Sequence, residues 1–486
     1  MESILSSYRR YWALDHSSAL LNWDSETYLP EDGFKYRGEA LAQIDSLQRE
    51  EILRLAPLVE KVKEEDLDDK NRGILRVLKR LIKYYTAIPT EISEKLIRLT
   101  TEAFNIWRKA KAKSDFSLFS PYLNEIVEIE KIIAEKLGYR GDPYNALLDL
   151  YEEGATVDDI DNVFNQLIPS SKRILENVLS EGYYPKEHPL EKVKYDINQM
   201  KKVNEDIIDL LGMPKSRFRM DISPHPFTIR ISINDVRITT RYEGIDFKST
   251  IFSVIHESGH ATYELMIDPN LEFTPLASGA SSGIHESQSR FWENMIGRSR
   301  DFVKILFPIL TENLDFVREY NEEEIYKYFN VVRPSSIRVD ADELTYNFHI
   351  ALRYNIEKGL INGSIDVKDL PSIWEEKMMS YLGLDIKNDS EGVLQDMHWS
   401  NGSFGYFPTY TLGNVVAGIT YSKLPNLHES IMERKFDNIR DLLAERLYKY
   451  GRTYPPKVLL ERSFNETYNP EYLIKYLENK YLNFSN

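Results

Sequence analysis

The chain has 486 residues, a formal net charge of −16, and hydrophobic side chains at 42% of its positions. This apolar content is enough for a sizeable core, so we do not expect a disordered chain. The acidic balance, without a clustered basic stripe, argues against a nucleic-acid-binding protein. The chain contains no cysteine, which excludes disulfides, thiolate nucleophiles and Cys-ligated zinc.

The N-terminal segment lacks the apolar run and cleavage site of a secretory signal. No stretch approaches the roughly 18 consecutive apolar residues that a membrane helix needs. We therefore expect a cytoplasmic protein with neither membrane nor nucleic-acid partners.

The first 220 residues predict one helix after another, because apolar side chains recur every three to four positions. Pro89 is placed to open one helix and Gly138 to close another. The predicted helices cover residues 4–23, 36–55, 73–88, 89–112, 119–137 and 157–179. We interpret most of this half as a scaffold.

The pattern changes near residue 225. Residues 227–233 and 235–242 alternate and are rich in Ile and Thr, which predicts a β-hairpin turning at Asn234 and Asp235. The strand at 235–242 is a candidate edge for pairing with an extended peptide. After residue 280 the pattern is helical again, apart from a Gly- and aromatic-rich loop at 398–413.

The strongest local motif, His256-Glu257-Ser258-Gly259-His260, follows this hairpin. We predict a helix there, capped by Asp246. On a helix, His256 and His260 share one face and can bind one metal ion, with Glu257 placed to take a proton from a metal-bound water. Gly259 leaves room for a close neighbour. The alternative is two core histidines beside an incidental glutamate.

A third metal ligand must be His, Asp or Glu, since the chain has no cysteine. Glu286, on a second predicted helix, is the best candidate; Arg290 lies one turn later to orient its carboxylate, and Glu293 lies on the same face. His285 is a competitor that points about 100° away around the helix. The alternative for Glu286 is an ordinary surface or core-paired carboxylate.

Several further motifs extend over most of the chain and support a family resemblance. They are residues 21–24 with Pro30, Gly33 and Arg37, then 225–227, 235–242, 256–260, 285–288, 337–345 and 392–399. In this order they resemble the carboxypeptidase Taq family of zinc metallocarboxypeptidases, also called thermostable carboxypeptidase 1.

The resemblance implies a mainly α fold over residues 1–486, a single helical peptidase domain with a deep cleft and a small sheet beside the metal helix. Residues 1–220 would flank or cover the cleft, and residues 221–486 would carry the zinc site. Homodimers are usual in the family.

The resemblance also implies the activity. One zinc ion, which cobalt can replace, would be held by His256, His260 and Glu286, with Glu257 as general base and acid. The family hydrolyses the last peptide bond of a peptide and releases single amino acids with broad specificity, disfavouring C-terminal proline.

The substrate's free carboxylate needs a cationic partner. Arg338 matches the family's IRxxAD motif and receives this role by resemblance, with Arg237 as the second candidate. We predict that the acidic cluster at 340–343 orients Arg338 or a metal-bound histidine, and that Arg353 forms a structural ion pair.

The tetrahedral oxyanion needs a hydrogen-bond donor besides the metal. By analogy with related helical zinc peptidases, we expect Tyr410 with His398 to supply it, and Tyr406 to contact the terminal carboxylate. The alternative is that these residues only pack the aromatic loop.

Two other functions remain as alternatives. The first is an oligopeptidase that cuts internally or releases dipeptides, which would have no use for a carboxylate-binding arginine. The second is a non-catalytic peptide-binding protein, which would need no metal.

Overall fold

The computed structural model describes residues 1–483, which form nineteen α-helices and one three-stranded sheet. This confirms the predicted mainly α fold. The helices are α1 (Glu2–Thr27), α2 (Phe34–Val59), α3 (Asp69–Ala87), α4 (Thr90–Lys113), α5 (Ser120–Leu137), α6 (Tyr144–Tyr151), α7 (Val157–Glu181), α8 (Ile197–Leu210), α9 (Lys248–Leu265), α10 (Ser282–Arg290), α11 (Arg300–Asn313), α12 (Glu322–Phe329), α13 (Tyr346–Asn362), α14 (Leu370–Leu382), α15 (Pro408–Lys423), α16 (Leu427–Met432), α17 (Phe436–Arg446), α18 (Pro456–Phe464) and α19 (Glu471–Leu482).

The chain folds into two compact units, each assembled from three separate segments. Unit 1 contains residues 1–85, 188–329 and 420–467; unit 2 contains residues 86–187, 330–419 and the segment from Tyr468 onwards. These boundaries do not coincide with the division we predicted near residue 220. That one peptidase domain covers the whole chain stays a prediction.

Unit 1 holds the sheet, made of β1 (Phe218–Ile222), β2 (Thr228–Ser232) and β3 (Asp235–Thr240). The predicted hairpin is confirmed as the antiparallel pair β2–β3. β1 was not predicted, although its five residues alternate between apolar and charged side chains. β3 is the central strand, with β1 parallel on its other side. The prediction of β3 as a free edge is therefore wrong, since both its edges are already paired.

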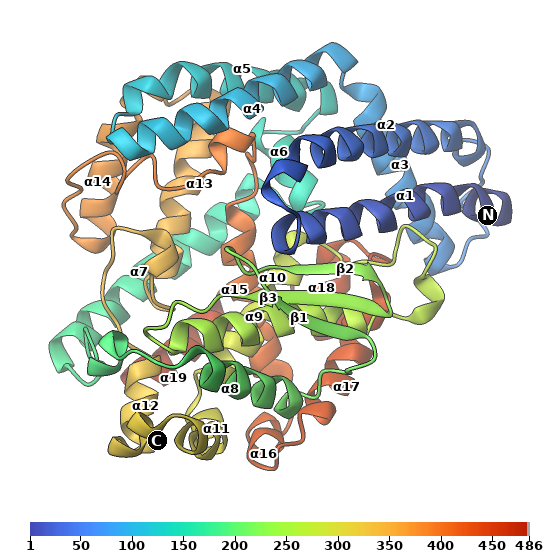
Figure 1. The fold of residues 1–486 in the computed structure, drawn as a ribbon. Coiled ribbons are helices and arrows are strands. Elements are labelled where there is room, and N and C mark those ends of the chain that lie inside the picture. Colours follow the sequence, from blue (N-terminus) through green and yellow to red (C-terminus); the bar gives the residue numbers. More distant parts are fainter. Residues whose placement is uncertain (484–486) are drawn as a thin grey trace. The chain divides into compact units, whose positions relative to one another are not determined.

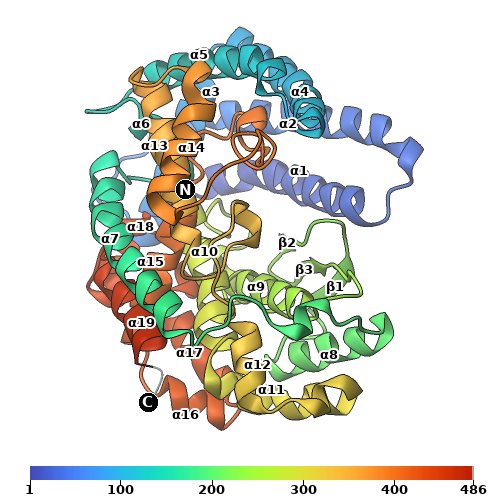
Figure 2. The ribbon, with the colours of Figure 1, turned by 90° about the vertical axis from the view of Figure 1, so that its left-hand side faces the viewer.

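The sheet packs against α9, which lies beside it in both views (Figures 1 and 2). Val236 and Ile238 of β3 and Ile251 and Ile255 of α9 are all fully buried. Alternating apolar residues on the strand and helically spaced ones on α9 thus form one interface. This interface fixes the helix that carries the His-Glu-x-x-His motif.

Unit 2 is built from helix pairs, α4 with α5, α13 with α14, and α7 with α19 (Figure 2). Pro89 precedes α4 and Gly138 ends α5, as predicted. α7 begins with a capping box in which the side chains of Thr156 and Asp159 bind each other's main-chain N–H groups. None of the helices within residues 1–483 combines the length and apolarity needed to cross a bilayer.

Candidate functional site

Two histidines on α9 face its neighbour α10. The helix was predicted, but its predicted cap is wrong: Asp246 has a left-handed backbone (φ 56°), and its carboxylate accepts a hydrogen bond from Tyr328 at 2.6 Å. Gly259 allows α10 to approach closely, because a Cβ there would lie 2.7 Å from the main-chain oxygen of Gln288. The close approach brings His256 and His260 next to the side chain of Glu286.

Glu286 completes a group of three ligand atoms. Its Oε2 lies 3.6 Å from Nε2 of His256 and 3.3 Å from Nε2 of His260, and all three atoms lie within 4.8 Å of one another. Ligand atoms about 2.0–2.1 Å from a tetrahedral metal ion are about 3.3 Å apart. Two imidazole nitrogens and a carboxylate oxygen are also donors that zinc accepts. The residues present therefore fit a metal ion of this kind.

The second oxygen of Glu286 is held by Arg290, as predicted. Arg290 Nε donates to Oε1 at 2.6 Å, and the hydroxyl of Ser289 donates to Oε2 at 2.8 Å. Burial raises the pKa of Glu286, but Arg290 and the two histidines bring it well below its usual value. The carboxylate is thus ionised and oriented before any metal binds.

His256 has an unpredicted partner. Its Nδ1 lies 2.8 Å from Oε2 of Glu293, whose Oε1 accepts from Arg298 at 3.1 Å. Burial raises the pKa of Glu293, but His256, Arg290 and Arg298 lower it to about 2. Glu293 lies in the π-helical segment η5 (Phe291–Gly297) that follows α10. The sequence predicted that Glu293 lies on the same helix face as Glu286, but not that it contacts His256.

His260 has a histidine as its partner. Its Nδ1 lies 2.6 Å from Nδ1 of His285, and Nε2 of His285 lies 2.7 Å from Oε1 of Glu264. If His260 uses Nε2 for a metal, its Nδ1 carries the proton. His285 then accepts at Nδ1 and donates from Nε2 to Glu264. The structure therefore places His285, our competing ligand, beside His260 and outside the three-atom group.

Glu257 lies one residue after His256 and is 7% exposed. Its Oε2 accepts a 2.6 Å hydrogen bond from the hydroxyl of Thr228 at the start of β2. The same hydroxyl lies 3.0 Å from the main-chain oxygen of Glu257. The sheet thereby fixes one oxygen of the carboxylate, a role for Thr228 that the sequence did not reveal.

Among the other predicted residues, His398, Tyr406 and Tyr410 lie in unit 2, and so does Arg338. Its Nε and Nη2 donate to Asp396 Oδ1 at 3.0 and 2.8 Å, and its Nη1 donates to the hydroxyl of Tyr346 at 3.1 Å. Arg353 approaches the other oxygen of Asp396 at 2.6 Å. We call Arg338, Asp396 and Arg353 the arginine cluster.

Two of the carboxylates predicted to orient Arg338 have other partners. Within residues 340–343, Asp342 accepts hydrogen bonds from the main-chain N–H groups of Leu344 and Thr345, both at 3.0 Å, and Glu343 pairs with Lys480 at 2.5 Å. These carboxylates hold the local backbone and α19. Arg338 is oriented instead by Asp396, 58 residues later, a distance at which spacing carries no information.

The aromatic loop brings His398, Tyr406 and Tyr410 together. Nε2 of His398 lies 3.4 Å from the hydroxyl of Tyr410, and the rings of Tyr406 and Tyr410 pack edge to face at 5.2 Å. The guanidinium of Arg338 lies 5.3 Å from the ring centre of Tyr410. Burial lowers the pKa of His398 to about 4 despite the opposing charge of Asp396. The imidazole is thus neutral at neutral pH.

Arg237, the second carboxylate candidate, lies in β3 of unit 1. Its Nε and Nη2 donate to the two oxygens of Asp235, each at 2.7 Å. The guanidinium also lies 4.4 Å from the ring centre of Trp23. Both features are typical of a structural arginine.

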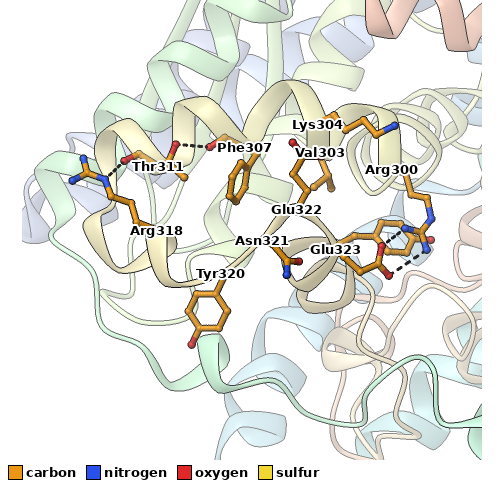
Figure 3. A pocket seen from close by; sticks show the side chains of 11 residues that line it. Arg300, Val303, Lys304, Phe307, Thr311, Arg318, Tyr320, Asn321, Glu322 and Glu323 are labelled. Carbon is orange, nitrogen blue, oxygen red and sulfur yellow. Dashed lines mark hydrogen bonds and ion pairs between the residues drawn. The ribbon is translucent and has the colours of Figure 1, made fainter.

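A hollow of about 860 Å³ lies on unit 1, between α11 and α12 (Figure 3). Phe307 and Tyr320 contribute apolar surface to it, and Arg300 and Glu323 form an ion pair at one end. Its lining shares no residue with the His256 group, so the hollow is separate from the candidate metal centre.

Comparisons with known proteins agree with this geometry. A family model described as carboxypeptidase Taq (M32) metallopeptidase matches residues 3–481. Thermostable carboxypeptidase 1 of Pyrococcus furiosus is 46% identical over 99% of this chain and 98% of that protein. Carboxypeptidase 1 of Bacillus subtilis is 37% identical over 96% of this chain and 94% of that protein.

Solved structures show the same likeness. A Pyrococcus furiosus carboxypeptidase superimposes with a TM-score of 0.97 at 46% identity, covering 99% of this chain and 98% of that one. Metallocarboxypeptidase 1 of Trypanosoma cruzi gives a TM-score of 0.95 at 34% identity, covering 99% of both chains. The chain therefore belongs to the carboxypeptidase Taq (M32) family and is a metallocarboxypeptidase, a hydrolase that acts on peptide bonds.

Proposed function

We propose that the protein is a zinc-dependent exopeptidase that hydrolyses the C-terminal peptide bond of peptides and releases single amino acids. The observation that carries the zinc proposal is the convergence of His256, His260 and Glu286, with nitrogen–oxygen distances of 3.3 and 3.6 Å. When bound, zinc supplies a Lewis acid that activates water and polarises the scissile carbonyl.

Glu257 is the proposed general base and acid. The Thr228 hydroxyl holds one of its carboxylate oxygens at 2.6 Å, so the second oxygen is oriented for proton transfer without a further side-chain rearrangement. It would take a proton from the attacking water and pass it to the amine of the departing amino acid. The burial of Glu257 keeps bulk water from competing for that proton.

Arg338 is the proposed binding residue for the free C-terminal carboxylate. A guanidinium has five N–H groups. On Arg338, three of them donate hydrogen bonds to Asp396 and Tyr346. One N–H remains on each terminal nitrogen, as paired recognition of a carboxylate requires. Arg237 is the weaker candidate, since both of its bonded nitrogens already serve Asp235.

Tyr410 and His398 are the proposed donors to the oxyanion, and Tyr406 is proposed to contact the terminal carboxylate. A 3.4 Å approach of His398 to the Tyr410 hydroxyl supports the pairing, because an imidazole held neutral can accept or donate one proton there. We further propose broad side-chain specificity that disfavours C-terminal proline, cobalt as a substitute metal, and a homodimer.

One experiment tests the exopeptidase proposal directly. The metal-loaded protein is incubated with matched peptides that end in a free carboxylate or an amide, and products are identified by mass spectrometry. We expect stepwise loss of single C-terminal residues from the free acids and almost none from the amides. Equal cleavage of both sets, or release of internal fragments and dipeptides, would instead show an oligopeptidase.

The role of Arg338 has its own control. We expect Arg338→Met to lower kcat/KM on free-carboxylate peptides by about 100-fold, the cost of a charge-assisted pair of hydrogen bonds. Arg241→Met is the matched control, because Arg241 forms an exposed ion pair with Glu243.

Metal analysis of the purified protein should give about one ion per chain, and reconstitution with zinc or cobalt then compares the two metals.

A further inference from the structure

Arg353 is a charged side chain to which the proposed mechanism gives no part. It lies on α13, and its side chain is 0% exposed. Its Nε and Nη2 both lie 2.6 Å from Oδ2 of Asp396, and its Nη1 donates to the main-chain oxygen of His349 at 2.9 Å. Because an unpaired buried charge is strongly unfavourable, Asp396 is the group that stabilises Arg353 in the interior.

Asp396 is shared between two guanidinium groups. Oδ1 accepts from Arg338 at 2.8 and 3.0 Å, while Oδ2 faces Arg353. Burial raises the pKa of Asp396, but the charges of the two guanidinium groups outweigh it and hold the pKa well below its usual range. Two positive charges and one negative charge leave the arginine cluster with a net charge of +1.

The neighbouring imidazoles do not change this charge. Burial, Arg353 and Arg338 lower the pKa of His349 to about 3. Burial and the same two arginines lower that of His398 to about 4, against the opposing effect of Asp396. Both histidines are therefore neutral near pH 7.

A further buried carboxyl group on α13 has other partners. Glu357 lies one turn after Arg353 on α13, but its oxygens accept hydrogen bonds from Tyr144 at 2.5 Å, Trp399 at 2.9 Å and the main-chain N–H of Gly405 at 3.0 Å. Burial raises the pKa of Glu357 to about 7, so it carries only part of a negative charge at neutral pH. Within residues 1–483, the carboxylate in ion-pair contact with both arginines of the cluster is Asp396, not Glu357.

The charge of Arg353 determines how strongly Arg338 attracts an anionic ligand. Arg338 and Asp396 alone would form a neutral pair, in which the aspartate repels an incoming carboxylate nearly as much as the arginine attracts it. Arg353 offsets the aspartate at Oδ2, whereas Arg338 binds Oδ1. At low effective dielectric, one added charge within the cluster changes the energy of a bound anion substantially.

We propose that Arg353 is a positioning residue for substrate recognition: by neutralising Asp396, it leaves the positive charge of Arg338 available to the C-terminal carboxylate of a peptide. Arg353 then acts on the substrate only through Asp396 and Arg338. This inference rests on the carboxylate-binding role proposed for Arg338.

The test compares two variants with the parent protein by the net charge of the arginine cluster. Kd is measured for one peptide as free acid and as amide, on metal-loaded protein that carries Glu257→Gln to prevent turnover. Arg353→Met leaves a net charge of zero, and we expect free-acid Kd to rise about tenfold while amide Kd stays unchanged. The double variant Arg353→Met with Asp396→Asn restores a net charge of +1, and we expect it to recover most of the lost free-acid affinity.

A merely structural role predicts the opposite outcome for the double variant. Removing both partners of a packed ion pair would then weaken binding at least as much as Arg353→Met alone, for acid and amide alike, and this result would overturn the proposal. Arg173→Met is the matched control, an exposed arginine of unit 2 that pairs with Glu478. We expect it to leave both affinities unchanged.

Two further variants test the proposal if Arg353→Met does not fold. Arg353→Lys keeps the charge and should hold the free-acid Kd within about threefold of the parent, whereas Arg353→Gln loses the charge and should repeat the tenfold loss. Equal affinities for these two variants would also overturn the proposal.

Failure of this inference is distinguishable from failure of the proposed function. If Arg338→Met leaves the preference for free acid over amide intact, the carboxylate role of Arg338 is wrong and the role of Arg353 falls with it. If Arg338→Met abolishes the preference while the Arg353 variants keep it, only the inference about Arg353 is wrong.

Discussion

Four buried glutamates, two in each unit, show opposite behaviour at nearly equal burial. Glu286 and Glu293 in unit 1 are 7% and 8% exposed, and Glu130 and Glu357 in unit 2 are 4% and 0% exposed. The pKa of Glu286 lies well below its usual value and that of Glu293 is about 2. Burial raises the pKa of Glu130 to about 8 and that of Glu357 to about 7.

The difference lies in the neighbours. Arg290 contacts Glu286 at 2.6 Å, and Arg298 contacts Glu293 at 3.1 Å. Within residues 1–483, no cationic side chain lies within ion-pair distance of Glu130. Residue type and depth therefore do not determine protonation; a guanidinium within reach does. The ionised pair can serve a metal ion and its histidines, whereas the other pair serves to anchor structure.

The largest expected effect is on kcat, when the carboxylate of Glu257 is replaced. Glu257→Gln keeps the shape and the hydrogen bond from Thr228 but removes the base. We expect kcat to fall about 10³-fold or more while metal content stays at the parent level. Stopped assays with a free-acid peptide, alongside metal analysis of the same sample, check both. Near-normal kcat would show that another group takes the proton.

The second expected effect tests the raised pKa in unit 2. The pKa of Glu130 rises from 4.5 in the unfolded chain to about 8 in the folded one, so the folded state binds the extra proton between these values. Stability then falls as pH rises through this window, on the order of 3 kcal/mol between pH 5 and pH 8. We expect Glu130→Gln to remove this part of the pH dependence, as measured by chemical unfolding at both pH values.

Glu128→Gln on the same helix is the control for that measurement, because Glu128 is exposed and pairs with Lys131. We expect it to leave the pH dependence unchanged. If Glu130→Gln also leaves it unchanged, Glu130 is ionised in the folded state and the contrast between the two units is wrong.

The third expected effect concerns the partner of His256. Glu293→Gln removes the negative charge that orients the imidazole and strengthens it as a ligand, and we expect metal affinity to fall about 10–100-fold. Competition with a chelator measures the affinity independently of activity. Glu445→Gln, at an exposed pair with Lys449 in unit 1, should leave affinity unchanged.

The smallest expected effect tests the close approach of α9 and α10. A Cβ on Gly259 would lie 2.7 and 2.8 Å from main-chain atoms of Gln288 and Ser289, so we expect Gly259→Ala to lower the free energy of unfolding by about 1–2 kcal/mol. Gly38→Ala on α2 is the control, since nothing lies within 4 Å of its Cβ position. There the better helix propensity of alanine should raise stability slightly. Equal effects at both sites would show that α10 yields without strain.

Periodicity and short-range spacing predicted most of the fold and the three candidate ligands. The two histidines and Arg290 with Glu286 are related by one helical turn, which the sequence displays directly. Contacts between distant segments were not predictable in this way. Asp396 reaches Arg338 and Thr228 reaches Glu257 only through tertiary packing. β1 alternates over only five residues, too short a run to show that it pairs with β3.

The prediction that Asp246 caps α9 is wrong for a different reason. Asp246 has the residue type of a cap, but its left-handed backbone turns the carboxylate towards Tyr328. Where a side chain has two possible hydrogen-bond partners, the surrounding structure determines which of them it binds.

The π-helical segment after α10 gives the metal centre one place where the chain length can change. A π turn spans i to i+5 and contains one residue more than an α turn, so removing one residue from 291–297 would let the hydrogen bonds return to i to i+4. The residues beyond the segment would keep nearly the same helical phase, and Arg298 would stay near Glu293 and the main-chain oxygen of Phe329. The same deletion between Glu286 and Arg290 in α10 would instead rotate all later residues by about 100° relative to Glu286.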